Sequence, residues 1–376
     1  MKKTLILSVA LMGAATAFAD LNGDGYYRVQ NYATDRYVSV VDNRGKIETS
    51  ATNADLQAIT LDNRFEVVSG DASTVLYIDK VNSQYNISSQ GTSVHDIIDH
   101  FVTIEQAGSA NGQNLYVAYG TYEGVAKYLG DGNNMGGDLG NMSVNTTGNY
   151  RKWYIKPIGA VGDNYFGVAA TVDAKAGAYQ GLYTTLYASF PASAYSDGVK
   201  FYTIDKIGEW GQVTLKEVNG TIPTATPIIV KCAGETSSDN RLNVGGEGAA
   251  VSSDPNMKGV YFNCGKGGHI NRVKYDFATM RVLGVCEDGS LGFVQQNLDY
   301  IPANTFYLTV PEGSPAEFKC VPESEFSGIG EIDADGAAKA VYTMTGLKLS
   351  DGMTDAEIAS LPSGLYIIDG KKTLLR

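Results

Sequence analysis

Short stretches of alternating apolar and polar residues recur along the chain, and breaks rich in glycine, asparagine and aspartate separate them. Alternation with a period of two places successive side chains on opposite faces of a strand. This pattern predicts strands at 27–30, 65–68, 75–78, 154–158 and 213–218, among others. Helical periodicity is nearly absent, although residues 354–357 form a capping box ahead of Ile358 and Leu361, which predicts one short helix there. We therefore predict an all-β protein.

Residues 20–158 contain a threefold repetition. Each third begins with a strand that carries tyrosine, at 26–29, 75–78 and 114–119. Each third ends in a strand centred on an aromatic residue, which is Phe65, Phe101 or Trp153. Because a unit of this size cannot enclose a core alone, three of them would pack around a pseudo-threefold axis.

Two segments of this region resemble a known family. YYRVQNYATDRYVSVVDN (26–43) resembles the opening of a ricin-type β-trefoil repeat, and RKWYIKPI (151–158) resembles its closing QxW-type strand. The resemblance implies a β-trefoil-like, lectin-like domain at 20–158 that binds carbohydrate or a host ligand.

By the same analogy, an aromatic platform with neighbouring Asp and Asn side chains would hold a pyranose. The candidate ligand-binding residues are Tyr37 with Asp42 and Asn43, Tyr77 with Asp79, and Tyr128 with Asp131 and Asn133. Tyrosines within strands also pack in cores and across strands, which is the alternative for each of these rings.

A second repetition lies in residues 159–327. GQVTLKEVNGTIPTATPIIV (211–230) aligns with GSLGFVQQNLDYIPANTFYLTV (289–310), and each contains an Ile-Pro dipeptide. Proline fixes φ and opens a turn before the next strand. Two such units facing each other predict an antiparallel β-sandwich with an internal duplication. The segments LYASFP (186–191), GVKFYTI (198–204) and VTLKEVNGTIPTATPIIV (213–230) together resemble a β domain common in secreted surface proteins of Gram-negative anaerobes.

Residues 328–376 form a distinct C-terminal β module. Segments 340–349 and 361–376 predict a strand, a loop and a hairpin, with Asp369-Gly370 as a tight turn. The segment resembles the C-terminal sorting domains of type IX secretion cargo. The resemblance implies recognition by that secretion machinery at the outer membrane, and an ordinary small β-sandwich is the alternative.

The N-terminus predicts export. Lys2 and Lys3 precede an apolar stretch, and Ala17-Phe18-Ala19 has the small-x-small pattern of a signal-peptidase site. Residues 1–19 are therefore predicted to be a signal peptide cleaved after Ala19. No later stretch has the length and apolarity of a transmembrane helix, so we expect a secreted or outer-membrane surface protein.

Composition and charge narrow the function classes. The chain has 376 residues with 44 Gly and 24 Tyr, which suits short strands joined by tight turns. Its net charge of −12 argues against a nucleic-acid partner, because such binding depends on clustered Lys and Arg.

No catalytic or cofactor motif is present in the sequence, including the GxSxG elbow, HExxH and the phosphate-binding loop. His95 and His100 are more typical of a polar turn than of a metal site, and no local group would activate Cys264 beside His269. We expect a non-catalytic protein with no metal and no cofactor. The alternatives are a structural surface protein without a sugar site and a secreted glycoside hydrolase with a carboxylate pair.

Four cysteines lie in the second half of the chain, at Cys232, Cys264, Cys286 and Cys320. Their spacing does not predict a zinc site. An exported protein could form one or two disulfides among them. Buried free thiols are the alternative, because cysteine is often simply buried.

Overall fold

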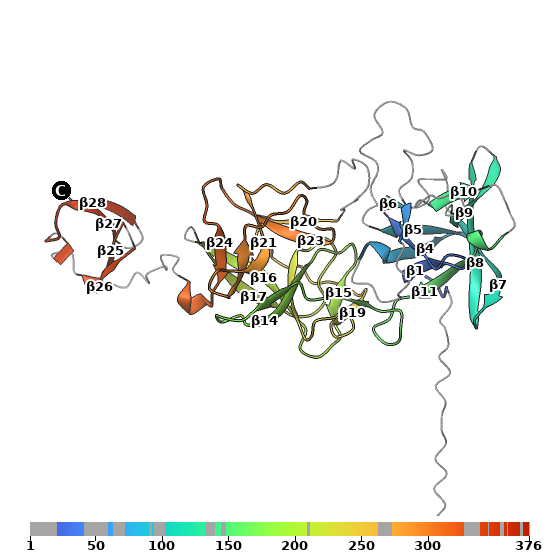
Figure 1. Ribbon diagram of the computed structural model, residues 1–376, viewed down its shortest axis with the longest axis horizontal. Coiled ribbons are helices and arrows are strands. Elements are labelled where there is room, and N and C mark those ends of the chain that lie inside the picture. Colours follow the sequence, from blue (N-terminus) through green and yellow to red (C-terminus); the bar gives the residue numbers. More distant parts are fainter. Residues whose placement is uncertain are drawn as a thin grey trace, which may run out of the picture.

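The computed structural model describes residues 21–40, 59–62, 72–89, 92–93, 102–122, 124–131, 140–143, 148–208, 211–261, 273–326, 339–344, 346–353, 357–358, 360–368 and 371–375. The predicted signal peptide, Phe65, Phe101 and the three histidines lie outside these residues. The described residues form four β-sheets, which confirms the predicted all-β class (Figure 1). Each sheet falls within one of the three predicted ranges, whose boundaries stay a prediction.

The N-terminal sheet has eleven strands and two short 3₁₀ turns. The strands are β1 Gly25–Asn31, β2 Tyr37–Val40, β3 Ile59–Asp62, β4 Leu76–Val81, β5 Gln84–Ser89, β6 Thr92–Ser93, β7 Thr103–Ala110, β8 Gln113–Tyr122, β9 Val125–Asp131, β10 Gly140–Ser143 and β11 Trp153–Pro157. The 3₁₀ turns are η2 Ala72–Thr74 and η5 Asn149–Arg151.

Six of these strands close a ring in the order β1-β4-β5-β7-β8-β11 and back to β1. The Tyr85–Val102 bridge joins β5 to the start of β7, with backbone N···O distances of 2.7 and 3.0 Å. The β2–β3 hairpin follows β1, β6 follows β5, and the β9–β10 hairpin follows β8. The chain therefore adds an outer segment once in each third of the ring, as expected for a β-trefoil-like domain.

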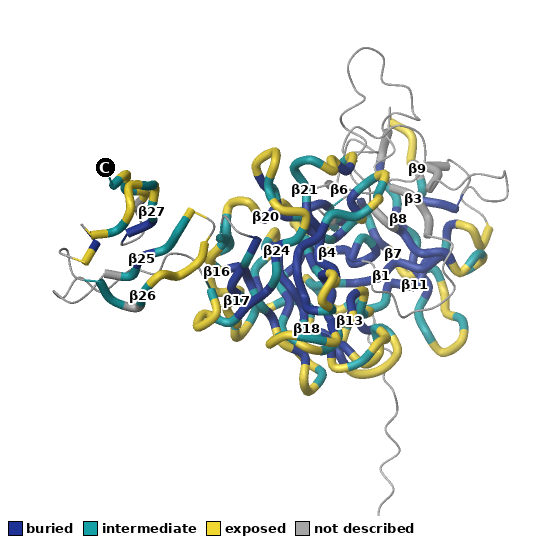
Figure 2. Tube along the Cα trace, turned by 60° about the vertical axis from the view of Figure 1, so that its left-hand side comes forward, coloured by how far each residue is buried: buried dark blue, intermediate teal, exposed yellow. Residues whose placement is uncertain are grey.

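Trp153 anchors the core of this ring. Its side chain is 1% exposed, and its Nε1–H donates to the carbonyl of Leu129 over 3.0 Å. Apolar side chains from all six ring strands surround it, and Figure 2 shows this buried interior. Trp153 thus packs where the closing aromatic residue of a threefold repeat is expected.

The middle domain contains β12 Phe166–Gly167, β13 Val172–Ala174, β14 Gly181–Leu186, β15 Ala192–Ala194, β16 Lys200–Gly208, β17 Gln212–Val218, β18 Ile228–Cys232, β19 Arg241–Val244, β20 Met257–Val260, β21 Met280–Val285, β22 Leu291–Val294, β23 Thr305–Thr309 and β24 Glu317–Cys320. Its ten-stranded sheet places β13-β14-β18-β16-β17 on one side of β24 and β22-β21-β23-β20 on the other. The three-stranded sheet β12-β19-β15 packs against the first of these groups.

The two halves of this domain share local conformations as well as strand order. Gly211 and Gly289 both have positive φ, of 78° and 83°, at the turn that opens each repeat. Ala225 and Asn304 occupy equivalent places after the Ile-Pro dipeptides and have φ of 55° and 56°. Such a match in rare backbone conformations supports the internal duplication predicted from the sequence.

The N-terminal ring and the middle domain share a packed contact. Arg28 is buried on β1, and its guanidinium donates to the Tyr165 carbonyl over 2.6 Å and to Asn164 Oδ1 over 3.1 Å. Ala72 and Val75 from the first region join the hydrophobic core that surrounds Phe166. These contacts hold β1 and the residues just before β4 against the middle domain.

The C-terminal module is a four-stranded antiparallel sheet of order β26-β25-β27-β28. Its strands are β25 Lys339–Thr343, β26 Lys348–Met353, β27 Gly364–Ile368 and β28 Lys371–Leu375. Ile368 pairs with Lys371, which fits the predicted two-residue hairpin. Of the predicted helix, Glu357 and Ile358 are described and are helical.

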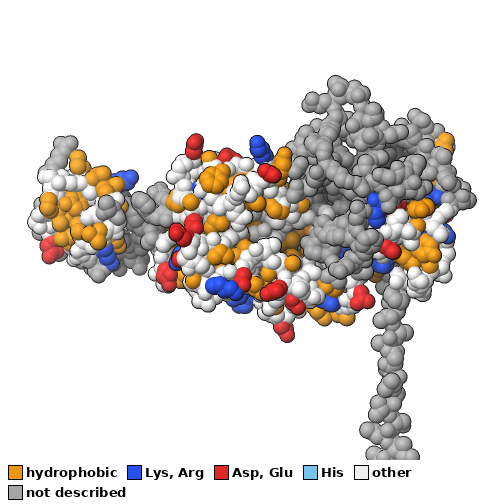
Figure 3. Space-filling view, in the orientation of Figure 1, with side chains coloured by type: hydrophobic (Ala, Val, Ile, Leu, Met, Phe, Trp, Pro, Cys, Tyr) orange, Lys and Arg blue, Asp and Glu red, His pale blue; other side chains and the backbone are white. Residues whose placement is uncertain are grey.

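One part of the C-terminal module leaves apolar side chains exposed. Leu365 and Leu374 lie directly opposite each other on β27 and β28, and both are exposed. Figure 3 shows hydrophobic side chains gathered on the face of this module that is in view.

Within the described ranges, no helix has the length and apolarity needed to cross a bilayer.

Candidate functional site

The structure separates the predicted ligand-binding residues. Tyr37 on β2 is 2% exposed, so its ring offers no surface to a ligand. Asp42, Asn43 and Asn133 lie outside the described residues. The described candidates that remain are Tyr77 with Asp79 and Tyr128 with Asp131. The first pair lies on β4 of the ring, and the second lies on β9 of the outer hairpin.

Asp131 forms a buried ion pair. Arg36 Nε donates to Asp131 Oδ2 over 2.9 Å, and Arg36 Nη2 donates to the other carboxylate oxygen. Thr34 Oγ1 also donates to Asp131 Oδ2. The two charged side chains are 3% and 0% exposed. The carboxylate of Asp131 is therefore used in holding β9 against the β1–β2 connection.

Tyr128 is the middle member of a stack on the β8–β9 hairpin. Its ring centroid lies 5.0 Å from that of Tyr119, its cross-strand partner. The Arg151 guanidinium lies over the Tyr128 ring at 4.9 Å. At the far end of the stack, Tyr119 donates its hydroxyl hydrogen to Glu105 Oε1 over 2.8 Å.

Tyr77 is the most accessible of the predicted rings. It is the second residue of β4, and its side chain is 36% exposed. Its cross-strand partner is Tyr26 on β1, with ring centroids 5.0 Å apart at an interplanar angle of 54°. Tyr26 in turn meets Phe190 of the middle domain edge-on at 6.0 Å. Tyr26 therefore packs against one side of the Tyr77 ring, while part of the ring stays open to solvent.

Polar side chains flank this ring. Asp79 lies two residues further along β4, on the same face, and accepts a 3.0 Å hydrogen bond from Asn86 Nδ2 on β5. Asp24 accepts a 2.8 Å hydrogen bond from the backbone N–H of Lys80. Partial burial and the negative charges of Asp24 and Asp79 raise the pKa of Tyr77 above its usual value. We call Asp24, Tyr26, Tyr77, Asp79 and Asn86 the Tyr77 face.

Of these five residues, Tyr77 and Asp79 were predicted from the sequence. The Asn86 partner could have been found, because the two-residue turn Asn82-Ser83 sets a register that pairs position 79 with position 86. Asp24 gave no such signal, since it precedes β1 and reaches Lys80 only through the β1–β4 pairing.

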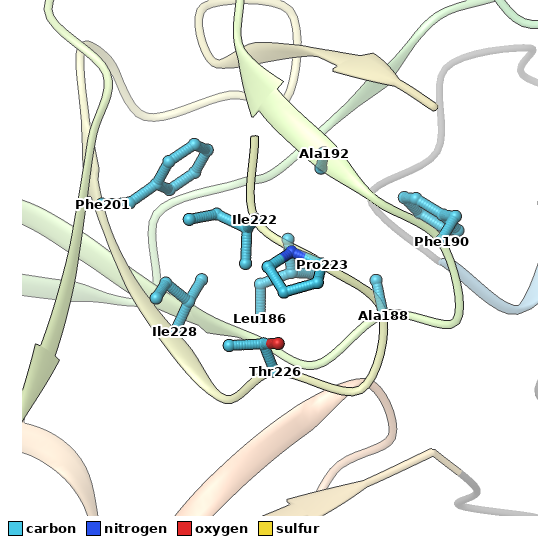
Figure 4. A pocket seen from close by; sticks show the side chains of 9 residues that line it. All are labelled: Leu186, Ala188, Phe190, Ala192, Phe201, Ile222, Pro223, Thr226 and Ile228. Carbon is cyan, nitrogen blue, oxygen red and sulfur yellow. The ribbon is translucent and has the colours of Figure 1, made fainter. Parts of the chain in front are cut away.

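A separate hollow lies in the middle domain, lined by Leu186, Ala188, Phe190, Ala192, Phe201, Ile222, Pro223, Thr226 and Ile228 (Figure 4). Even with the solvent space at its mouth it holds about 240 Å³, less than the range typical of small-molecule sites. Thr226 supplies its one polar side chain. An apolar hollow of this size lacks the polar groups that orient a ligand.

The described cysteines are free and buried. They are Cys232, Cys286 and Cys320, and Cys264 lies outside the described residues. Burial raises the pKa of Cys232 to about 12 and that of Cys286 to about 11. Such thiols stay protonated at neutral pH and are poor nucleophiles. The part of the chain that is described holds no group of three His, Cys, Asp or Glu side chains that could bind a metal ion.

A scan against protein-family models and a search of curated proteins give no match for this chain. A search of solved structures gives an alignment with the crystal structure of the hemolytic lectin CEL-III. That alignment has a TM-score of 0.23 and 11% sequence identity, and it covers 90% of this chain and 73% of that chain.

Proposed function

We propose that the protein is an exported, non-catalytic binding protein that holds a carbohydrate on its N-terminal ring, at the Tyr77 face. The observation that carries the proposal is the partly exposed Tyr77 ring with two carboxylates beside it. The ricin-type resemblance of residues 26–43 and 151–158 adds to it.

The Tyr77 face combines the two kinds of contact that a pyranose needs. The C–H groups on one face of the sugar can pack against an aromatic ring. Sugar hydroxyls can donate to the carboxylates of Asp24 and Asp79, and the Asn86 amide contributes both donor and acceptor atoms. Because two carboxylates lie beside the ring, the face favours neutral sugars and repels acidic ones.

Replacing Tyr77 by Ala should weaken sugar binding on the order of ten-fold or more, because the stacking surface is lost. The measurement is a glycan array with the full chain, followed by ligand-observed NMR titration with methyl β-galactoside, methyl α-mannoside and N-acetylglucosamine. Asp79→Asn should weaken the same ligand, since an amide accepts hydroxyl hydrogen bonds less strongly than a carboxylate does.

The matched control is Tyr195→Ala, which removes an exposed tyrosine of the middle domain and should leave binding unchanged. Equal binding by Tyr77→Ala and the unchanged chain would contradict the placement of the site. If no neutral sugar binds at millimolar concentration, the result would favour the alternative of a structural surface protein without a sugar site. Release of nitrophenol from nitrophenyl glycosides would favour the hydrolase alternative.

We also propose that residues 1–19 direct export and that the C-terminal module directs sorting to the cell surface. The sorting proposal rests on the resemblance of residues 340–349 and 361–376 to type IX sorting domains. Deleting residues 328–376 in the producing cell should leave the protein in the periplasm. The measurement is immunoblotting of periplasm, surface and medium, and normal surface display of the truncated chain would refute the proposal.

A further inference from the structure

Tyr26 connects the Tyr77 face to the middle domain. Its ring centroid lies 5.0 Å from that of Tyr77, and it meets the buried Phe190 ring edge-on at 6.0 Å. Tyr26 is itself half-buried and packs against the hydrophobic cluster of the middle domain that contains Phe190. The exposed ring of the Tyr77 face is therefore linked through one side chain to the core of another domain.

A glycine of the middle domain also borders the Tyr26 ring. Gly245 has a φ of 99°, and a Cβ atom at this position would lie 3.4 Å from Tyr26 Cε2. Its backbone N–H donates to the carbonyl of Pro191 over 2.8 Å, which ties this glycine to the residue that follows Phe190. Two segments of the middle domain that are bonded to each other thus border the same ring.

The chain next to Tyr77 is held by the same domain. Val75, two residues before Tyr77, is 1% exposed and packs in the hydrophobic cluster of the middle domain. The Arg28 guanidinium donates to the Tyr165 carbonyl over 2.6 Å and, through Nε, to Thr74 Oγ1 over 3.1 Å. The strand that carries the exposed ring is therefore fixed to the middle domain at its start.

We propose that sugar binding at the Tyr77 face depends on the middle domain, and that Phe190 and Gly245 are positioning residues for it. They hold Tyr26, and Tyr26 sets the orientation of the Tyr77 ring against which the sugar packs. A ring already held in its binding orientation loses less conformational freedom when a ligand binds, so the affinity rises. This inference rests on the proposed carbohydrate-binding function and assigns control of that site to two domains.

Phe190→Leu in the full chain should weaken neutral-sugar binding about three-fold or more, because the edge contact with Tyr26 is lost. The measurement is ligand-observed NMR titration with methyl β-galactoside, methyl α-mannoside and N-acetylglucosamine, at a temperature where circular dichroism shows the variant folded. The matched control is Phe201→Leu. Phe201 is 3% exposed, belongs to the same cluster and lies across the hollow from Phe190 (Figure 4), so this variant should keep the affinity.

A double-mutant cycle tests whether Phe190 acts through Tyr26. Tyr26→Leu should weaken sugar binding, and adding Phe190→Leu to it should cause no further loss, since the contact between the two rings is already absent. Losses that multiply in the double variant would mean that Phe190 affects binding by another route, and would overturn its positioning role.

A pair of neighbouring glycines tests Gly245. Gly245 and Gly246 both have positive φ, of 99° and 91°, but a Cβ atom at Gly246 would lie near Thr221 rather than Tyr26. Gly245→Val should therefore displace the Tyr26 ring and weaken sugar binding, whereas Gly246→Val introduces similar backbone strain and should not. Equal affinities for the two variants would show that Gly245 has no positioning role.

The Tyr77 ring can also be followed without any sugar. In a chain with carbon-13-labelled tyrosine rings, the NMR signal that Tyr77→Ala removes identifies Tyr77. Phe190→Leu should shift this signal and Phe201→Leu should leave it in place. An unshifted signal, or sugar binding that Phe190→Leu does not weaken, overturns the positioning role alone. A shifted signal in a chain that binds no sugar supports the link from Phe190 to Tyr77 and overturns the carbohydrate proposal.

Discussion

Asp131→Asn should lower the free energy of unfolding of the N-terminal ring by about 3–5 kcal/mol. The substitution keeps the shape of the side chain but leaves the Arg36 cation in the interior without its carboxylate. Transfer of an uncompensated charge out of water is expensive, whereas the intact pair offsets that cost. The measurement is denaturant unfolding followed by the fluorescence of Trp153, with Trp210→Phe as the background because the chain has two tryptophans.

Two controls identify the buried charge as the cause. The double variant Arg36→Met/Asp131→Leu should recover much of the loss, because it removes both charges and fills their space with apolar groups. Asp173→Asn removes a carboxylate that pairs with Lys175 on the surface, and it should change stability little. A loss of less than 1 kcal/mol for Asp131→Asn would show that the Arg36 cation reaches water.

Trp153→Ala should destabilise the ring by about 3–5 kcal/mol, because it leaves a cavity at the centre of the six-stranded core. Trp153 is the closing aromatic residue of the third repeat, and side chains from β1, β4, β5 and β8 pack in the same cluster. The measurement is thermal and chemical unfolding followed by circular dichroism, since the variant lacks the fluorescent reporter.

Trp153→Phe separates the apolar contribution from the hydrogen bond. Phenylalanine keeps most of the apolar volume but loses the Nε1–H that donates to the Leu129 carbonyl, so a smaller loss of about 1–3 kcal/mol is expected. If Trp153→Ala costs no more than Trp153→Phe, the indole ring does not anchor the core.

Asp131 is both a predicted sugar ligand and one half of the buried ion pair with Arg36. The sequence placed Asp131 beside Tyr128 as a candidate sugar ligand, but the structure pairs its carboxylate with Arg36. A loss of sugar binding in an Asp131 variant would therefore report unfolding before it reported a lost contact. Asp79 is a better position for testing recognition, because it is only partly buried.

The sequence by itself determined the local elements of this protein. Alternation predicted the strands, the Ile-Pro dipeptides predicted matching turns at 222–225 and 301–304, and Asp369-Gly370 predicted the C-terminal hairpin. These features depend on residues that are neighbours in the chain, so the pattern of a short segment contains them. The Asn86 partner of Asp79 belongs to the same class, since a short hairpin turn sets it.

Only the tertiary structure decided which side chains are available to a ligand. Tyr37 and Tyr77 lie in similar strand patterns, yet one is 2% exposed and the other 36%. Arg36 and Asp131 are distant in the chain and meet only because the end of β9 lies against the β1–β2 connection. Exposure and charge pairing depend on how the ring closes, and ring closure is set by contacts between segments far apart in sequence. The chemistry of the candidate sites follows from that closure.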